Sequence, residues 1–378
     1  MRKLYILTVL LAVMLPCAGK DKDLRIDTPS GQLVLTPLTD NAVRVRIVGG
    51  TAVPQLEELV YTEDVKAPKF KTSVRDGLHT LKLKGMSAVY DMSADVLSFY
   101  NASGELILKE SSRSIAESSV QDVPCLSVSQ SFASPDDEVI LGTGQFQDGY
   151  LNIKGLTRRL TQVNTQISVP FVLSNKGYGL LWNNYGLTDF NPADRVCQLE
   201  AAGSEGGSVM VNATGTSGNR RERRSFGNFT GTMSVPSDGQ YAILLDVGQS
   251  MARKHYVAID DVVCIDANNT WLPPTASAIV SLKAGEHKVE VRGSMGDHPV
   301  LNWRRVDATT TFSSPVATAL DYTVFAGGAD EVMRSYRRLT GEVPQMQDWM
   351  FGYIHCRERY NTQDEIISNM KGFQENDI

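Results

Sequence analysis

The chain has 378 residues, with 37 Lys and Arg against 43 Asp and Glu, and therefore a formal net charge of -6. This acidic balance argues against a nucleic-acid-binding protein, because no basic field is present to release the counterions of phosphate groups. A chain of this length fits about two or three domains. Its 31 Gly and 15 Pro, with many Val and Thr, favour short strands separated by turns.

The N-terminal stretch Met1–Gly19 has a basic start, an apolar core and small residues before Lys20. This pattern is typical of a secretory signal peptide and predicts a secreted or periplasmic protein. A membrane anchor fits less well, because the apolar run falls short of the roughly 20 residues that span a bilayer. Lipidation at Cys17 would instead give an outer-surface lipoprotein, although Pro16 fits that cleavage pattern poorly. The pattern of residues does not indicate an oligomeric state.

The cysteines after Cys17 and the five histidines lack the spacing of metal ligands. No Cys-x-x-Cys pair occurs, and buried free thiols are favoured over a dense disulfide framework. We therefore predict no metal and no cofactor. The cysteines concerned are Cys125, Cys197, Cys264 and Cys356.

Alternating apolar and polar residues predict paired strands in the first part of the chain. The segments Leu24–Thr28 and Ala42–Val48 both have this period of two, and Val43, Val45 and Ile47 share one face. A further hairpin pattern runs from 87 to 108, with the turn at 101–104. Stacked antiparallel strands of this kind predict a β-sandwich.

The stretch 141–184 is unusually rich in glycines and polar amide side chains. A loop of that kind offers several donors and acceptors to sugar hydroxyls, while Tyr or Trp offers a flat apolar face. From composition alone, a plain surface loop between strands is the favoured interpretation. The Gly142-x-Gly144 pair does not indicate a nucleotide site, because Gln147 stands where a third glycine belongs and no helical pattern follows.

Between 195 and 311 the chain changes character and predicts a second, inserted β-sandwich. Alternating strands are expected over Gln240–Asp246, His255–Asp266 and Gly285–Arg292. Asp260 and Asp261 suit either a calcium site or a tight turn, and the turn is favoured. The arginine-rich run 220–224 is most simply a solvated face.

The last part of the chain predicts a strand, a helix and then one β-loop-α unit. Acidic residues at the start of Ala329–Thr340 and basic residues at its end are typical of a helix. Met350–Cys356 is a short apolar run that suits a strand buried on both faces. Thr362 and Glu365 have the spacing of a capping box, with apolar residues following at helical spacing.

These motifs together resemble glycoside hydrolase family 31. The resemblance rests on Gly142-x-Gly144-Gln145, on the run from Ser174 through Gly177-Tyr-Gly-Leu-Leu-Trp182, and on Tyr336-Arg-Arg-Leu-Thr-Gly before Pro344. It continues in the β-loop-α unit, whose matching residues are Pro344, Trp349, Phe351-Gly352-Tyr353, Cys356-Arg357, Tyr360 and Asp364-Glu365. The segment from 195 to 311 resembles the β-sandwich found in anthrax protective antigen.

The resemblance implies a mainly β fold with a defined order of domains. A galactose-mutarotase-like N-terminal β-sandwich is expected to be interrupted by the inserted sandwich and followed by the first β-α unit of a truncated (β/α)8 barrel. The implied divisions are signal peptide 1–19, N-terminal sandwich 20–194 plus 312–343, inserted sandwich 195–311 and barrel start 344–378.

The implied activity is retaining hydrolysis of an α-glycoside, favouring an α-xylosidase that acts on xyloglucan oligosaccharides, with α-glucosidase or α-galactosidase activity as alternatives. The partner would be an oligosaccharide or plant polysaccharide fragment. By the resemblance, Gln162 and Asn164 lie in a loop over the barrel mouth. Arg357 and Glu358 follow the first barrel strand, and Glu358 matches a residue that lines the sugar pocket. A structural ion pair near the strand end explains Arg357 and Glu358 equally well. No catalytic residue is expected up to Ile378, because both catalytic carboxylates come from later barrel strands. A non-catalytic carbohydrate-binding or adhesion protein is the alternative of another class.

Overall fold

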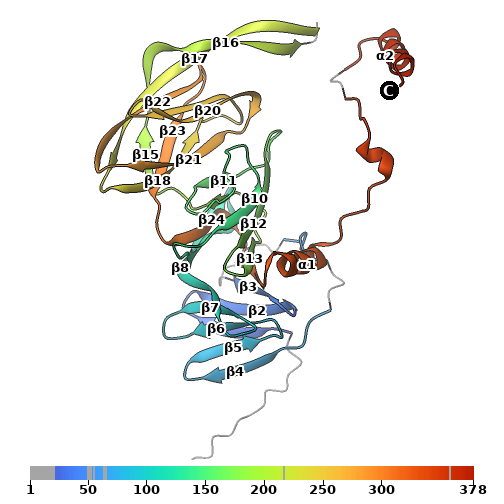
Figure 1. Ribbon diagram of the computed structural model, residues 1–378. Helices are drawn as coiled ribbons and strands as arrows, with labels where there is room; N and C mark the ends of the chain where they lie inside the picture. The colour runs from blue at the N-terminus through green and yellow to red at the C-terminus, as the bar shows by residue number, and fades with distance from the viewer. Residues whose placement is uncertain (1–21, 49–52, 54–55, 63–65, 216–217, 357–358) are drawn as a thin grey trace, which may run out of the picture.

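The computed structural model describes residues 22–48, 53, 56–62, 66–215, 218–356 and 359–378. The predicted signal peptide 1–19, with Cys17, and the predicted site residues Arg357 and Glu358 lie outside the described residues. Within the described part, strands dominate and form four sheets, which stack as two sandwiches (Figure 1). No described helix is both long enough and apolar enough to cross a membrane.

The first sandwich consists of a seven-stranded and a nine-stranded sheet, both antiparallel. In spatial order, the seven-stranded sheet contains β1 (Leu24–Thr28), β2 (Gly31–Thr39), β3 (Ala42–Val48), β25 (Leu320–Ala326), β13 (Tyr178–Trp182), β12 (Ile167–Ser174) and β10 (Ile140–Gln145). The nine-stranded sheet contains β11 (Arg158–Leu160), β14 (Thr188–Phe190), β24 (Thr309–Ala317), β9 (Val123–Ala133), β8 (Leu106–Val120), β7 (Val96–Asn101), β6 (Met86–Asp91), β5 (Leu78–Lys82) and β4 (Lys71–Arg75).

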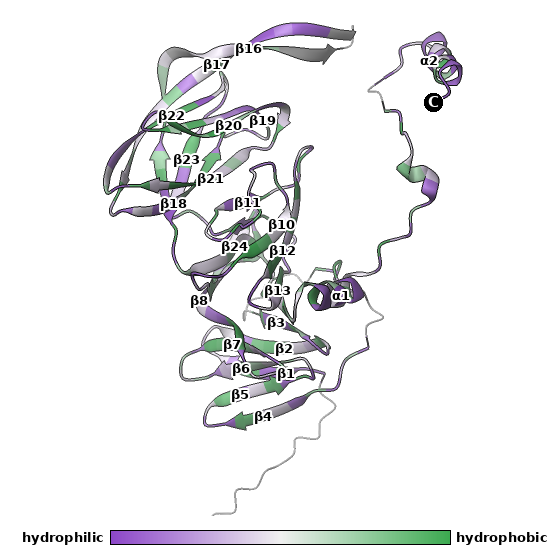
Figure 2. Ribbon diagram, viewed as in Figure 1, coloured by the Kyte–Doolittle hydropathy of each residue, from purple (hydrophilic) through white to green (hydrophobic). Residues whose placement is uncertain are grey.

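The core of the first sandwich lies between these two sheets. Val43, Val45 and Ile47 of β3 are fully buried there, as the alternating pattern predicted. Trp182 of the seven-stranded sheet stacks on Phe312 of the nine-stranded sheet, with the ring centroids 5.7 Å apart. Figure 2 shows hydrophobic and hydrophilic residues alternating in short patches along the strands, which is the pattern of sheets that are buried on one face.

The second sandwich is formed by the strands between β14 and β24. Its four-stranded sheet contains β15 (Arg195–Gln198), β23 (Val300–Arg305), β18 (Gly239–Asp246) and β21 (Thr275–Leu282). Its five-stranded sheet contains β16 (Glu200–Gly215), β17 (Gly218–Val235), β22 (Gly285–Ser294), β19 (Ala252–Ile259) and β20 (Val262–Leu272). The strands predicted over 240–246, 255–266 and 285–292 all form, although Asp260 and Asp261 divide the second of these into β19 and β20.

The second sandwich interrupts the first between two strands that pair with each other. β14 and β24 are antiparallel neighbours, with Asp189 opposite Ser313, so the chain leaves the nine-stranded sheet and returns beside its point of exit. β24 already begins at Thr309, before the predicted end of the insertion at 311. The second sandwich has its own core, in which Val257 and Val291 of one sheet and Ile243 and Leu301 of the other are buried together.

The Asp260–Asp261 pair forms the turn between β19 and β20. Both residues have positive φ angles, of 50° and 64°, as a two-residue turn of type I′ requires. The carboxylate of Asp260 binds His287 Nδ1 at 2.6 Å and the backbone N–H of Lys288 at 2.9 Å. Among the described residues, no cluster of His, Cys, Asp or Glu is placed to hold a metal ion. The turn interpretation of this pair therefore accounts for its geometry.

Helix α1 (Ala329–Thr340) has the predicted bounds and covers the outer face of the seven-stranded sheet. The carboxylate of Glu331 accepts a hydrogen bond from the backbone N–H of Gly328 at 2.7 Å, which satisfies a donor at the helix start. Val332 and Leu339 pack into a buried cluster with Leu181 and Phe325 of the sheet. The helix is thereby fixed by its apolar face as well as by its cap.

The prediction of a strand over Met350–Cys356 is wrong. A short 3-10 helix, η1 (Asp348–Phe351), occupies its start, and the rest of the described segment has no regular structure. Phe351 and Ile354 are 77% and 70% exposed. A strand buried on both faces needs neighbours that pair with its backbone. In Figure 1 the segment instead runs away from both sandwiches, and no described strand pairs with it.

The helix predicted after this segment forms as α2 (Gln363–Glu375). Its N-cap is Thr362, whose hydroxyl accepts a hydrogen bond from the backbone N–H of Glu365 at 3.2 Å. The side chain of Glu365 in turn binds the backbone N–H of Asn361 at 2.8 Å. This local capping pattern forms the helix although the neighbouring strand is absent.

Candidate functional site

The predicted sugar-contacting loop connects β11 to β12 and comprises residues 161–166; we refer to it as the β11–β12 loop. Its ends are held together by the backbone carbonyl of Thr161, which accepts hydrogen bonds from Gln166 Nε2 at 3.0 Å and from Ser168 Oγ at 2.9 Å. Val163 and Gln166 form an isolated β-bridge across the loop. The loop is therefore a tight, internally bonded turn and presents its tip at the surface.

Gln162 and Asn164 are both exposed at this tip. The carbonyl oxygen of the Gln162 side chain accepts a hydrogen bond from the backbone N–H of Ser168, so this residue braces the loop. Asn164 makes no side-chain hydrogen bond within the described part of the chain. Its amide is thus free to donate to and accept from a ligand, as a sugar hydroxyl requires.

A second loop, residues 146–150, follows β10 and lies beside the first. Its shape depends on Gly144, which has a φ of 104° and lies so close to β12 that an added Cβ would be 2.1 Å from the carbonyl oxygen of Ile167. Only glycine fits such a position. Strand β10 bulges between Gly142 and Gly144, which directs the chain into the 146–150 loop.

Asp148 ties the 146–150 loop to β11. The buried guanidinium of Arg158 binds both of its carboxylate oxygens, at 2.7 Å and 2.6 Å from Nη2, and also donates to Thr143 Oγ1 at 2.7 Å. The aromatic ring of Phe146 lies against the same guanidinium, 4.3 Å from its centre. The pKa of Arg158 is lowered by burial, which the charge of Asp148 offsets only in part.

Both loops contact the second sandwich. Arg159 binds Asp189 of its own sandwich at 3.0 Å and Asp246 of the second sandwich at 2.9 Å. The hydroxyl of Tyr150 accepts a hydrogen bond from the backbone N–H of Ile279 at 2.9 Å. Thr165 Oγ1 donates to the backbone carbonyl of Trp271 at 2.5 Å. The junction between the sandwiches is therefore bridged by polar contacts from both loops.

A cavity of about 300 Å³ lies at this junction. One wall is the 146–150 loop with Arg159 and Gln166, and the other comes from β20, β21 and the turn between them. Aromatic rings and hydrogen-bonding groups both line it, as in carbohydrate sites. The polar lining residues include Gln147, Asp148, Arg159, Gln166, Asp266, Thr275 and Ser277.

Two titratable groups in the wall from the second sandwich, His255 and Cys264, are uncharged at neutral pH. Burial lowers the pKa of His255 to about 4, and its Nε2 lies 2.9 Å from the carbonyl oxygen of Pro273, so the neutral ring donates that hydrogen bond. Burial raises the pKa of the Cys264 thiol to about 11. The thiol therefore stays protonated and is a poor nucleophile. The neutral His255 and Cys264 side chains therefore suit binding of a ligand better than covalent chemistry.

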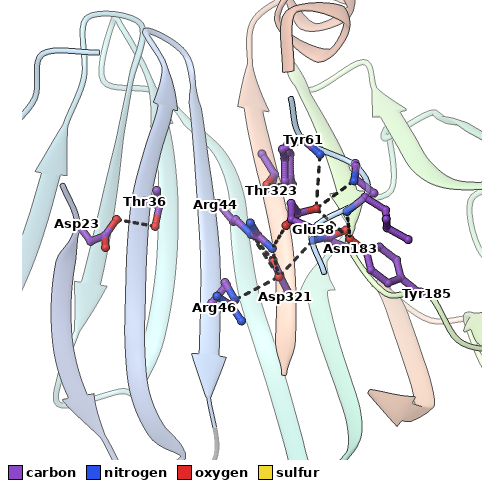
Figure 3. A network of polar contacts seen from close by, with 12 residues as sticks. Asp23, Thr36, Arg44, Arg46, Glu58, Tyr61, Asn183, Tyr185, Asp321 and Thr323 are labelled. Carbon is purple, nitrogen blue, oxygen red and sulfur yellow. Dashed lines mark hydrogen bonds and ion pairs between the residues drawn. The ribbon is translucent and has the colours of Figure 1, made fainter. Parts of the chain in front are cut away.

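A separate polar network lies on the outer face of the seven-stranded sheet (Figure 3). Arg44 binds Asp321 through Nε at 2.9 Å and Nη2 at 2.5 Å, and also binds Glu58 at 2.8 Å. The hydroxyl of Tyr185 donates to Glu58 at 2.9 Å. Burial favours the protonated form of Glu58, but the charge of Arg44 and these hydrogen bonds outweigh it and lower the pKa. The network fixes the segment 56–62 against the sheet.

Comparison with known proteins assigns part of this chain to a family. Residues 32–191 match the glycosyl hydrolase 31 N-terminal galactose mutarotase-like domain. This stretch includes both loops described above. Residues 32–191 are therefore similar to the N-terminal domain of glycoside hydrolase family 31.

The curated proteins similar to this chain include two that are named as glycosidases. The chain is 23% identical over 326 residues to an α-xylosidase of Saccharolobus solfataricus. The aligned region covers 81% of this chain and 29% of that protein. It is 34% identical over 179 residues to an uncharacterized family 31 glucosidase of Pseudescherichia vulneris. That aligned region covers 40% of this chain and 32% of that protein. The chain thus spans about a third of the length of these relatives.

Solved structures share the fold. The family 31 α-xylosidase of Xanthomonas citri matches 94% of this chain and 43% of its own, with a TM-score of 0.74 and 22% identity. A family 31 α-xylosidase from a soil metagenome, solved with xylose, matches 95% of this chain and 40% of its own, with a TM-score of 0.57 and 21% identity. At these identities the likeness establishes the arrangement of strands.

Of the four predicted site residues, the structure describes two. Gln162 and Asn164 lie together at the tip of the β11–β12 loop, whereas Arg357 and Glu358 fall outside the described residues. The sequence analysis missed the contact of this loop with Trp271 and the contact of Arg159, on β11, with Asp246. The dense polar composition of 141–184 indicated an unusual loop, but nothing in the pattern indicated which strand of the second sandwich it contacts.

Proposed function

We propose that this chain is the N-terminal part of a retaining α-glycoside hydrolase, an α-xylosidase that acts on xyloglucan oligosaccharides. The observation that carries the proposal is the family 31 domain at 32–191. The named activity of the relatives from S. solfataricus and X. citri, α-xylosidase in both, supports the choice of sugar. These relatives align with 81% and 94% of the chain, well beyond the family domain alone.

In this proposal the residues of this chain bind and orient the substrate, and residues of the later barrel strands break the glycosidic bond. A retaining glycosidase needs two carboxyl groups roughly 5 Å apart, one as nucleophile and one as acid/base. Three of the partly or fully buried carboxylates, Asp148, Glu110 and Asp321, are each held by an arginine. Such pairing favours a structural role. The nucleophile and the acid/base would follow residue 378, on later strands of a barrel that begins at 344–378.

The β11–β12 loop would lie over the mouth of that barrel. Asn164 would exchange hydrogen bonds with sugar hydroxyls, and Gln162 would hold the loop in the binding geometry through Ser168. Arg357 and Glu358 would line the pocket of the sugar that is cleaved off. Positioning of this kind lowers the barrier by fixing the substrate before reaction.

The proposal includes a cellular location for the protein and a role for the second sandwich. The stretch Met1–Gly19 would direct export to the periplasm or the medium, or to the outer surface if Cys17 is lipidated. The second sandwich would be a module of the protective-antigen type. Its polar contacts with both loops and with Arg159 of β11 would extend the substrate-binding surface beyond the first sandwich.

An α-glucosidase is the second candidate. It is favoured by the P. vulneris relative, a family 31 glucosidase by name, which at 34% is more similar to this chain over the stretch it covers than the S. solfataricus α-xylosidase. Xylose and glucose differ by one hydroxymethyl group, so a pocket that selects xylose must lack room for it. The choice between these two sugars therefore depends on residues around the cleaved sugar.

Hydrolysis of aryl α-xyloside and aryl α-glucoside by the full-length gene product tests the proposal, with residues 20–378 as the control. We expect release of the aglycone from the xyloside by the long protein and none by the control. Release from the glucoside alone favours the second candidate. If the long protein cleaves neither substrate, a non-catalytic carbohydrate-binding protein becomes the better account.

A further inference from the structure

Trp271, near the end of β20, projects an indole ring from the second sandwich toward solvent. The ring is 44% exposed, while the next residue, Leu272, is 3% exposed and packs in the core. This alternation places Trp271 on the outer side of the strand. No role was assigned to this residue by the sequence motifs.

Two contacts hold Trp271 in place. The guanidinium of Arg253, on the neighbouring strand β19, lies over the indole with its central carbon 4.9 Å from the ring centroid. The backbone carbonyl of Trp271 accepts the hydrogen bond from Thr165 Oγ1 at 2.5 Å. A large exposed aromatic ring is thereby fixed beside the β11–β12 loop, although the two residues are separated by 106 positions in the chain.

The surroundings of the ring match the chemistry of a pyranose. A sugar ring whose hydroxyls are all equatorial leaves its two faces apolar, and such a face stacks on an aromatic ring. Its hydroxyls then point sideways toward hydrogen-bonding groups. Asn164, which is next to Thr165 in the chain, has an exposed side-chain amide with both donor and acceptor groups. An exposed aromatic ring bonded to the loop that carries an exposed amide supplies the two kinds of group that a sugar subsite needs.

We propose that Trp271 is a stacking platform for a β-linked glucose unit in the backbone of the oligosaccharide substrate, with Asn164 bonding its hydroxyls. The platform rests on the proposed function, because it lies next to the loop that would cover the barrel mouth. In this proposal the second sandwich recognises the glucan chain. The sugar that is cleaved is recognised elsewhere.

Cellotetraose is the probe, because it carries the β-linked backbone but no α-linked sugar that the enzyme could release. Its affinity for the full-length protein is measured by calorimetry for the wild type, Trp271→Ala and Trp271→Phe. We expect Trp271→Ala to weaken binding about two- to tenfold, the range of one aromatic contact, and Trp271→Phe to retain most of the affinity. Val263→Ala is the matched control, since Val263 is also on β20 and is 49% exposed.

Circular dichroism of each variant separates loss of the platform from loss of the fold. Equal affinity of the wild type and a folded Trp271→Ala protein would overturn the platform, as would failure of the wild type to bind cellotetraose. Aryl α-xyloside hydrolysis by the same wild-type preparation tests the proposed function separately. If cellotetraose binding depends on Trp271 but the protein does not cleave the xyloside, the platform is supported and the α-xylosidase assignment is refuted.

Discussion

The guanidinium of Arg158, inside the first sandwich, binds the carboxylate of Asp148, with Nη2 2.7 Å from one oxygen and 2.6 Å from the other. The Arg158 side chain is 2% exposed and that of Asp148 is 11% exposed. Because Asp148 belongs to the 146–150 loop, this ion pair fixes the wall of the cavity between the sandwiches. Stability and site geometry are therefore coupled through one pair of side chains.

Replacing Asp148 with alanine should strongly destabilise the protein. The change leaves a buried guanidinium without its charge partner, which typically costs about 3–5 kcal/mol of unfolding free energy. Urea unfolding measures the loss. Asp137→Ala is the matched control, because Asp137 pairs with Lys176 at the surface with its side chain 78% exposed, and exposed pairs contribute less than about 1 kcal/mol. Equal small losses in both variants would contradict this account of the pair.

His255→Gln should make the protein less sensitive to acid. Burial lowers the pKa of His255 from 6.5 to about 4 in the folded state. Between those values the unfolded chain binds a proton that the folded chain does not, so stability is lost as the pH falls from about 6.5 to about 4. Glutamine does not titrate, and its amide can still donate to the carbonyl of Pro273.

The comparison is the unfolding free energy at pH 7 and at pH 5 for the wild type and His255→Gln. We expect the wild type to lose about 1–2 kcal/mol more than the variant over this interval. His287 has a raised pKa, from its hydrogen bond with Asp260, and so stabilises the fold below its ordinary pKa, with the opposite sign. It is unchanged in the variant and cancels in the difference. Identical losses in the two proteins would show that His255 does not titrate as stated.

Asn164→Ala should weaken the use of oligosaccharide substrate without changing stability. One lost hydrogen bond corresponds to about 0.5–1.5 kcal/mol, or a rise in KM of about two- to tenfold. Gln162→Ala should raise KM as well and also lower the thermal midpoint, because Gln162 braces the loop through Ser168. Gln198→Ala, an exposed glutamine on β15, is the control. A KM for Asn164→Ala equal to that of the control would remove Asn164 from the site.

Local patterns predicted the elements whose causes are local. Val43, Val45 and Ile47 form one buried face of a strand, α1 spans the expected residues, and Thr362 caps α2. The strand expected over Met350–Cys356 failed because strand formation depends on neighbours that pair with its backbone, and apolar composition alone does not supply them.

The site was predicted only in part for a related reason. The polar composition and the family resemblance located Gln162 and Asn164 on one loop. Trp271, which contacts that loop, and Asp246, which binds Arg159 of β11, come from strands far along the chain, and no period or spacing links them to this region. The role of Gly144 in aiming the 146–150 loop likewise appears only when β12 is in place beside it.

Release of xylose from a xyloglucan oligosaccharide by the full-length gene product tests the central claim most directly. The products are separated by chromatography, and an oligosaccharide with α-linked glucose in place of xylose is offered in parallel. The account predicts free xylose, with retention of the α configuration at early times when the reaction is followed by NMR. Release of glucose from the second substrate without any release of xylose, or no release from either, would contradict it.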